Sequence, residues 1–294
     1  MLSLPELIGN TPLLKLDVGS VNIWAKAEFM NPSGSIKDRP AHRIMHEAMK
    51  NGKLKRGDTL IEATSGNMGI SFAMLCAYYG IKCVLIMPKN MSEERKNAFR
   101  AYGAQLIEVG DGDFDAAIKI RNEMAEKNCW FNGNQFHSEW NISAHIDGTG
   151  SELWNQLREQ NVQLDGFVAG TGTGGTLMGV GHVFNTLSPK TKIVAVEPFE
   201  SPVMSGGKKG QHGIQGIGDG SKFLVNLTKV DEIVLVKTHE AQMYSTTLAS
   251  TKGLFIGFSA CANLIAAERW AKNTGAKNVA TVLCDRGDRY FSNI

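Results

Sequence analysis

Short apolar runs alternate with amphipathic stretches of helical length along most of this chain. In its first half we assign strands to residues 22–28, 59–63, 83–87, 105–109 and 129–132. The intervening stretches with helical spacing of apolar residues are 35–51, 69–79, 92–102 and 114–127. Strands that alternate with helices of this length form parallel sheets that helices cover on both faces.

The second half repeats this pattern after a break near residues 134–146. Its predicted strands are 166–170, 192–197, 232–236 and 279–284, and its predicted helices are 150–159, 177–187, 240–250 and 260–274. Regular patterning disappears between 198 and 222, where seven glycines suggest a loop shaped for a site. The predicted fold class is therefore α/β, with two lobes that each hold a mainly parallel twisted sheet flanked by helices.

The composition fits a soluble globular protein with a sizeable core. Of its 294 residues, 43% are hydrophobic and 20% are charged, and the formal charge is only +2. Because no basic run is present, we expect no nucleic-acid partner. No apolar window approaches the roughly 20 residues of a membrane span, and the N-terminus lacks a targeting pattern. We therefore expect a cytoplasmic protein without a membrane partner.

Cysteine and histidine spacing gives no sign of a metal site. The five cysteines are an odd number without a CxxC pair, so neither a disulfide framework nor a zinc knuckle is indicated. His42 and His46 are four residues apart on a predicted helix, but no HExxH order and no third ligand accompany them. We predict no metal.

The first candidate for chemistry is Lys37, within the run Asn31-Pro32-Ser33-Gly34-Ser35-Ile36-Lys37-Asp38-Arg39. A turn rich in Pro, Gly and Ser just before a helix displays backbone N–H groups and one side chain at the helix start. Such a position suits a nucleophilic lysine. The alternative is a solvated lysine in a capped turn, which is the usual state of a lysine.

A second candidate is the glycine-rich stretch Gly170–Thr176, which follows an apolar strand and precedes a helix. Its N–H groups, its threonine hydroxyls and the positive end of the helix would hold a phosphate without a basic side chain. It lacks the Gly-Lys-Ser/Thr of a P-loop and the acidic residue of a dinucleotide fold. A purely structural turn is the alternative.

A third candidate, Thr64–Gly69, also lies between a strand and a helix. Its N–H groups and hydroxyls could bind a carboxylate, and the Asn67 amide could donate to a ring hydroxyl. An ordinary helix cap is the alternative, although the carboxyl end of a parallel strand is where such sheets place ligands. Two further turns, Gly257–Ala260 and Cys284–Tyr290, do not by themselves indicate a function.

Taken together, the three candidate segments resemble the signature segments of fold-type II pyridoxal-phosphate enzymes, and specifically of the cysteine synthases (O-acetylserine sulfhydrylases). The resemblance covers nearly the whole chain, from Ile8–Leu13 through Asn134–Phe136 to Cys284–Tyr290. It implies the tryptophan-synthase-β-like fold, with a smaller mobile domain at 35–140 and a larger domain formed by 1–34 and 141–294.

The resemblance also implies roles for individual residues. Lys37 would form the Schiff base with pyridoxal 5'-phosphate, and Asn67 would bond its ring hydroxyl. Ser259 would face the pyridine nitrogen. The residues implied for the cofactor's phosphate are Gly172, Thr173, Gly174, Gly175 and Thr176, and those implied for the substrate carboxylate are Thr64, Ser65, Gly66, Met68 and Gln135.

The implied activity is β-replacement, in which L-cysteine is made from O-acetyl-L-serine and sulfide, with thiosulfate as a further donor, through an aminoacrylate intermediate. The implied enzyme is a homodimer, and its association with serine acetyltransferase is left open. Two alternatives stay open: cystathionine β-synthase or another serine β-replacement enzyme, and a non-catalytic binding or regulatory homologue.

Two positions depart from the family pattern. Met68 stands where the family usually has Thr, which removes one hydroxyl from the carboxylate loop. Asp219 stands where the family's Gly-Ile-Gly-Ala-Gly loop has Ala, and its carboxylate would disfavour anionic nucleophiles if it points inward. The Cys284–Tyr290 and Asn31–Ser35 segments are similar to the B-type isozyme, which we favour, whereas the loop at 198–222 is more similar to the A-type.

Overall fold

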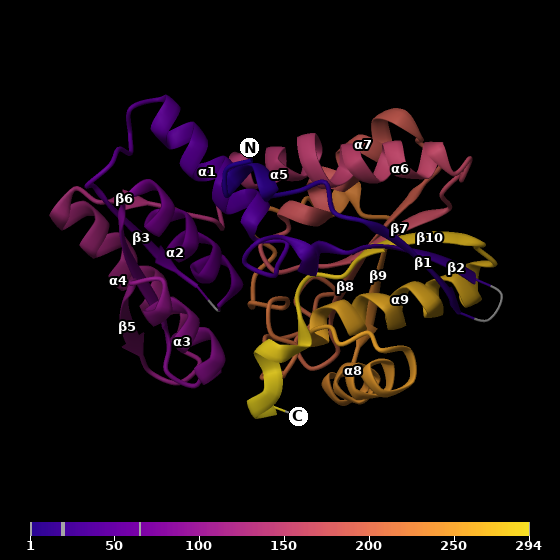
Figure 1. Cartoon of the computed structure of the whole chain (residues 1–294). Helices are drawn as coiled ribbons and strands as arrows, with labels where there is room; N and C mark the ends of the chain where they lie inside the picture. The colour runs from indigo at the N-terminus through magenta and orange to yellow at the C-terminus, as the bar shows by residue number, and fades with distance from the viewer. Residues whose placement is uncertain (1, 19–20, 65, 294) are drawn as a thin grey trace. The chain divides into compact units, whose positions relative to one another are not determined.

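The chain folds into two compact units, each with its own sheet (Figure 1). This computed structural model describes residues 2–18, 21–64 and 66–293. The first unit comprises Met1–Ile8, Asn31–Asn141 and Arg289–Ile294, and the second comprises Gly9–Met30 and Ile142–Asp288. The two-lobed α/β fold class is confirmed. The domain boundaries at 35–140 and the mobility of that domain stay predictions.

The first unit contains a four-stranded parallel sheet in the order β5-β4-β3-β6. Its strands are β3 (Thr59–Ala63), β4 (Lys82–Pro88), β5 (Gln105–Val109) and β6 (Phe131–Asn132). Its helices are α1 (Asp38–Lys50), α2 (Asn67–Tyr79), α3 (Glu93–Ala101) and α4 (Phe114–Asn128). Each strand is followed by a helix or a loop that returns to the same end of the sheet, as parallel pairing requires.

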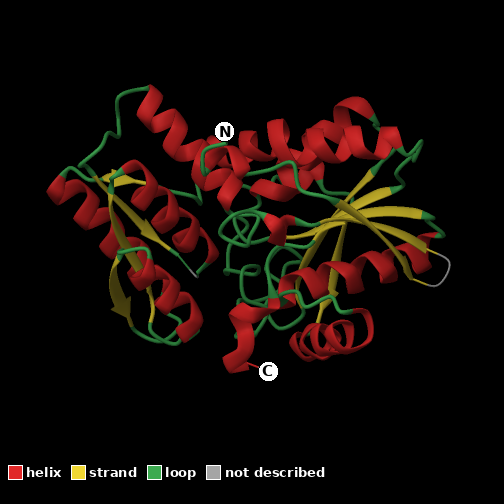
Figure 2. Ribbon diagram, viewed as in Figure 1, coloured by secondary structure: helices red, strands yellow, loops and turns green. Residues whose placement is uncertain are grey.

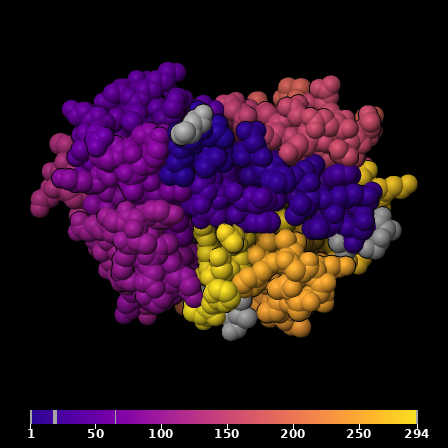
Figure 3. Space-filling model, viewed as in Figure 1, coloured from indigo at the N-terminus to yellow at the C-terminus, as the bar shows by residue number. Residues whose placement is uncertain are grey.

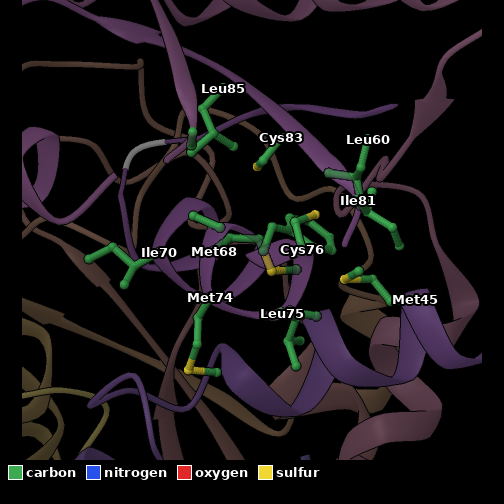
Figure 4. Packing of buried hydrophobic residues seen from close by; sticks show 14 of the residues in the cluster. Met45, Leu60, Met68, Ile70, Met74, Leu75, Cys76, Ile81, Cys83 and Leu85 are labelled. Atoms are coloured by element: carbon green, nitrogen blue, oxygen red, sulfur yellow. The ribbon is translucent and has the colours of Figure 1, made fainter. Parts of the chain in front are cut away.

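Apolar clusters cover this sheet on both faces. One cluster joins α1 and α2 to alternate residues of the strands, and Figure 4 shows Met45, Leu75 and Leu85 among its members. The other packs α4 against Ile61 and Ile86. Each fully buried side chain of this size contributes on the order of 1.5–3 kcal/mol, so the two clusters hold the helices on the sheet.

The second unit contains a six-stranded sheet in the order β1-β2-β10-β7-β8-β9. Its strands are β1 (Leu13–Val18), β2 (Val21–Lys26), β7 (Gly166–Gly170), β8 (Lys192–Pro198), β9 (Glu232–Val236) and β10 (Asn278–Val282). Its helices are α6 (Ser151–Glu159), α7 (Gly175–Leu187), α8 (Thr238–Lys252) and α9 (Phe258–Thr274). All its strand pairs are parallel except β1 with β2. The short helix α5 (Glu139–Ala144) crosses the boundary between the units.

Strand β1 was not predicted from the sequence. It is an edge strand, and the indigo segment that contains it lies at the surface in Figure 3. Lys15 and Asp17 point outward, with side chains 47% and 74% exposed, and their charged groups lie 3.4 Å apart. Charged side chains on an exposed edge discourage pairing with another chain.

The long irregular loop was predicted correctly. After β8 ends at Pro198, the next regular element is the 3-10 turn Leu227–Lys229, and the connection is drawn without helix or strand in Figure 2. Within the described residues, no helix combines the length and the apolarity that crossing a membrane needs.

Several predicted boundaries were wrong by a few residues. The first helix begins at Asp38 rather than at residue 35, because the turn before it continues to Lys37. The strand predicted at 22–28 ends at Lys26, since Glu28–Met30 forms a 3-10 turn. The strand predicted at 279–284 ends at Val282.

Candidate functional site

Lys37 lies at the N-cap position of α1 in the first unit, and its side chain makes no capping bond. The residue is half-buried, and its backbone N–H donates to Ser35 Oγ at 3.3 Å. Gly34, with φ of 84°, allows the sharp turn that precedes it. The side chain therefore projects from a backbone that is fixed by the turn and by the first turn of the helix.

Asp38, directly after Lys37, anchors this turn to α2. Its carboxylate accepts from the Ser33 N–H at 2.7 Å, from Ser33 Oγ, and from Ser71 Oγ at 2.6 Å. Complete burial raises the pKa of Asp38, while the bonds from Ser33 and Ser71 pull the pKa in the other direction. The carboxylate thus holds the Lys37 turn against the helix that begins at Asn67.

The loop between β3 and α2 is organised by Thr64. Its Oγ1 accepts from the N–H groups of Gly66 at 3.0 Å and of Gly69 at 3.2 Å. These two N–H groups are therefore directed to Thr64 rather than to a ligand. Gly66 has a φ of 149°, and the side chain of Arg95 fills the space where a Cβ would lie. Ser65 lies outside the described residues.

Met68 reaches this loop only through its backbone. Its side chain is 2% exposed and belongs to the apolar cluster beneath α2 (Figure 4). The N–H groups in the first turn of a helix have no partner within the helix, so the first turn of α2 can still bind a carboxylate. The Thr hydroxyl of the family pattern is replaced here by a core residue.

Gln135 lies beside the end of β3, where its Nε2 donates to the carbonyl of Ala63 at 3.1 Å. Its backbone N–H donates to Glu62 Oε2 at 3.1 Å, and Arg121 donates to Glu62 Oε1 at 2.9 Å. The side chains of Glu62 and Arg121 are 0% and 2% exposed. This buried ion pair places Gln135 next to the Thr64 loop.

In the second unit, the predicted phosphate loop connects β7 to α7. Gly174, with φ of 88°, is the N-cap of α7. A Cβ on Gly172 would lie 2.5 Å from the carbonyl oxygen of Gly216 and 3.3 Å from Asp219 Oδ2. The Gly218 N–H donates to the Thr171 carbonyl at 2.9 Å. The long irregular loop therefore packs directly on the glycines and places the Asp219 carboxylate beside them.

A buried histidine, which the sequence did not reveal, contacts the end of this loop. His145 is 1% exposed; its Nε2 lies 3.3 Å from Thr176 Oγ1 and its Nδ1 lies 2.9 Å from Thr149 Oγ1. It belongs to a π-helical turn, His145–Gly150, and such turns are frequent at functional sites. The histidine orients the Thr176 hydroxyl at the start of α7.

Asn263 links α9, the helix that begins near Ser259, to the strand that ends at the phosphate loop. Ser259 is 3% exposed in the first turn of α9, and Asn263 follows one turn later. Asn263 Oδ1 accepts from the Gly170 N–H at 2.7 Å, while its Nδ2 donates to the Val282 carbonyl at 2.9 Å. Asn263 thus fixes α9, β7 and β10 to one another where these elements meet, and Ser259 lies at that end of α9.

The donor groups fit the parts of pyridoxal phosphate that the sequence assigned to them. The loop at Gly172–Thr176 has no room for side chains at Gly172 and Gly174 and offers the N-terminus of α7, as a phosphate requires. In the first unit, Arg289 donates to Asn67 Oδ1, so the amide nitrogen is the end of the Asn67 side chain with the chemistry to donate to a ring oxygen. Each unit holds its own part of the donor set.

Comparison with known proteins gives one consistent result. The family model described as "Pyridoxal-phosphate dependent enzyme" matches residues 4–285. A cysteine synthase of Staphylococcus aureus is 41% identical over 99% of this chain and 95% of its own length. Cysteine synthase B of Campylobacter jejuni is 40% identical over 98% of this chain and 96% of its own. Among solved structures, a hydrogen sulfide-producing enzyme of Fusobacterium nucleatum has a TM-score of 0.93 at 38% identity, covering 99% of this chain and 90% of its own.

Proposed function

Since this chain belongs to the pyridoxal-phosphate dependent enzymes and, within them, to the cysteine synthase family, we propose that it converts O-acetyl-L-serine and hydrogen sulfide into L-cysteine and acetate. The observation that supports this proposal lies within the first unit, where Asp38 and Arg289 tie the turn of Lys37 to the start of α2 and to Asn67. In the second unit, the glycine-lined N-terminus of α7 separately offers a place for a phosphate.

Each of these residues would bind a different part of the cofactor. Lys37 Nζ would attach to the aldehyde carbon of the cofactor, Asn67 would donate to its ring oxygen, and Gly172–Thr176 would hold its phosphate. Ser259 presents a neutral hydroxyl, which does not keep a proton on the ring nitrogen as a carboxylate would. When bound, the cofactor would supply an electron sink for loss of the α-proton, and the electron pair freed at Cα would then expel the β-leaving group.

Side chains of the protein would carry out the proton transfer and bind the substrate. Once released from the cofactor, the Lys37 amine would take the proton from the substrate Cα and hold it at Nζ. The first turn of α2, the Thr64 hydroxyl and Gln135 would bind the substrate carboxylate and so fix which Cα–H bond faces Lys37. We also propose a homodimer that works in a reducing, cytoplasmic compartment, with which the five free cysteines agree.

Steady-state kinetics with matched substrate pairs test the activity. O-acetyl-L-serine and L-serine are each combined with sulfide, thiosulfate and homocysteine, and kcat/KM is measured for every pair. We expect O-acetyl-L-serine with sulfide to exceed every serine pair by at least about tenfold. A preference for serine with homocysteine would instead identify a cystathionine β-synthase. Absence of turnover with every pair, in protein that binds the cofactor, would support a non-catalytic homologue.

A second candidate activity is the release of sulfide from L-cysteine, with water as the nucleophile and L-serine as the other product. The Asp219 carboxylate beside Gly172 supports it, because a carboxylate accepts a proton from a neutral nucleophile and repels an anionic one. A structurally similar relative is a hydrogen sulfide-producing enzyme, which agrees with this candidate.

Asp219→Asn separates the two activities. We expect it to lower serine and sulfide formation from L-cysteine by about 100-fold, the usual contribution of a general base. Cysteine formation from O-acetyl-L-serine and sulfide should stay the same or rise by up to about threefold, because the charge that repels an anionic nucleophile is gone. The products are quantified by chromatography. Asp231→Asn, just before β9, is the control at an aspartate that pairs with Lys192. Equal loss of both activities in Asp219→Asn would show that Asp219 acts on neither nucleophile selectively.

A further inference from the structure

The turn Cys284–Tyr290, which the sequence left without a role, leads into a segment of the first unit formed by residues 289–293. The Tyr290 ring is fully buried, and the Arg95 guanidinium carbon lies 4.7 Å from its centroid. Ser92 Oγ donates to the Arg289 carbonyl at 3.3 Å, and the Ser292 N–H donates to Glu94 at 2.9 Å. These contacts hold the segment against the start of α3.

The Arg289 side chain extends from this segment to two of the candidate turns. It is 8% exposed, and its guanidinium donates to Asn67 Oδ1 and to the backbone carbonyl of Ser33. Ser33 is the residue whose N–H and Oγ bind Asp38, next to Lys37. One buried guanidinium therefore joins the turn before Lys37 to the first residue of α2.

A guanidinium has only donors, so the atom of the Asn67 amide that faces Arg289 must be the oxygen. The Asn67 amide is planar, and its Nδ2 then points away from Arg289 with its two N–H groups. Charge-assisted bonds of this type are stronger than neutral ones, so the orientation is well defined. Loss of Arg289 would remove the charged donor that fixes which end of the amide carries the oxygen.

We propose that Arg289 is a positioning residue that aims the Asn67 amide nitrogen at the ring oxygen of the cofactor. This inference rests on the proposed use of pyridoxal phosphate by this chain. Arg289 itself acts through Asn67 and through the Ser33 carbonyl, and its positive charge opposes the rise that burial causes in the pKa of Asp38. Its role is to keep the ring oxygen in its ionised form, because a hydrogen bond to the charged form favours that form.

The test uses Arg289→Met, which keeps the length of the side chain and removes its donors, and Arg289→Lys, which keeps one cationic donor group. Cofactor affinity is measured by titration of the apoenzyme, and the long-wavelength absorption band of the holoenzyme is followed against pH. We expect Arg289→Met to bind the cofactor about tenfold more weakly, as for the loss of a hydrogen bond to a charged group. We also expect the long-wavelength band to appear only at higher pH, with Arg289→Lys intermediate.

Two comparisons separate positioning from general damage. Arg286→Met, three residues earlier with a side chain 60% exposed, should leave both affinity and band unchanged. In an Asn67→Ala background, Arg289→Met should weaken cofactor binding by less than about a further twofold, because the amide that Arg289 positions is gone. Should Arg289→Met be too unstable to purify, Arg289→Lys carries the same comparison.

Two outcomes would overturn the inference. A folded Arg289→Met holoenzyme with wild-type affinity and a wild-type pH dependence of the band would show that Arg289 does not position Asn67. If Arg289→Met and Asn67→Ala weaken cofactor binding by amounts that add fully in the double variant, Arg289 acts through a group other than Asn67. Failure of the wild-type protein to take up the cofactor at all would instead reject the proposed function, so the two failures are distinguishable.

Discussion

Lys37→Ala should lower turnover of O-acetyl-L-serine with sulfide by at least about a thousandfold, because it removes both the attachment point of the cofactor and the base. After reduction with borohydride, mass spectrometry of the wild-type digest should find the cofactor on the peptide that contains Lys37. The variant should retain cofactor through its phosphate, without covalent attachment to any peptide.

A loss of turnover in Lys37→Ala must be distinguished from damage to the turn that holds Lys37. Lys53→Ala, at an exposed position just after α1, is the matched control and should keep full turnover and covalent labelling of Lys37. Added methylamine or ethylamine should restore part of the activity of Lys37→Ala, since a small amine can supply the missing base. Covalent labelling of another lysine in wild-type protein would refute the assignment of Lys37.

Arg121→Met should destabilise the protein by about 3–5 kcal/mol, the usual cost of leaving a buried charge without its partner. The lost partner is the fully buried Glu62, which also fixes the Gln135 backbone, so KM for O-acetyl-L-serine should rise as well. Urea unfolding at pH 7 measures the change in the free energy of unfolding. The matched control is Lys119→Met on the same helix, at an exposed position, which should stay within about 0.5 kcal/mol of wild type.

The destabilisation should also depend on pH in a defined direction. Burial raises the pKa of Glu62, and the Arg121 guanidinium is the main group that opposes this rise. In Arg121→Met the pKa of folded Glu62 therefore lies further above its value in the unfolded chain. The folded state then binds the proton more tightly, so stability is present at acidic pH and is lost as pH rises through the folded pKa.

Adding Glu62→Gln to Arg121→Met tests that explanation. The Ala63 and Gln135 N–H groups bind different oxygens of Glu62, so glutamine keeps an acceptor for one of them and carries no charge. Part of the stability at pH 7 should therefore return, and its pH dependence should flatten. If Arg121→Met alone is as stable at pH 8 as at pH 5, the pair does not hold a charge in the folded protein.

From the sequence we could predict which candidate loops lie between a strand and a helix. Gly170–Thr176 could be placed between a strand and a helix because apolar spacing ends at Gly170 and resumes at Leu177. The structure puts the end of β7 at Gly170 and the start of α7 at Gly175. The Lys37 turn was placed by the same kind of pattern, although the proline, glycine and serine residues extend the turn further than expected.

Contacts across long stretches of sequence could not be predicted in this way. His145 lies 31 residues before Thr176, and Asn263 lies 93 residues after Gly170. Spacing patterns report which residues share a helix or strand, and they carry no information on which element lies opposite. One signal was available for the buried pair: Glu62 is a lone charge inside the apolar run Thr59–Ala63, and a charge in a buried strand requires a partner.

The placement of Arg289 affects the order in which the protein is assembled during synthesis. Asn67 and Arg289 are separated by 222 residues, and a ribosome that adds roughly 5–20 residues per second needs on the order of 10–40 s to cover them. During that interval the sheet of the first unit can form, but the Asn67 amide has no guanidinium to orient it. We therefore expect the Asn67 amide to reach its final orientation toward the cofactor only after Arg289 has been translated.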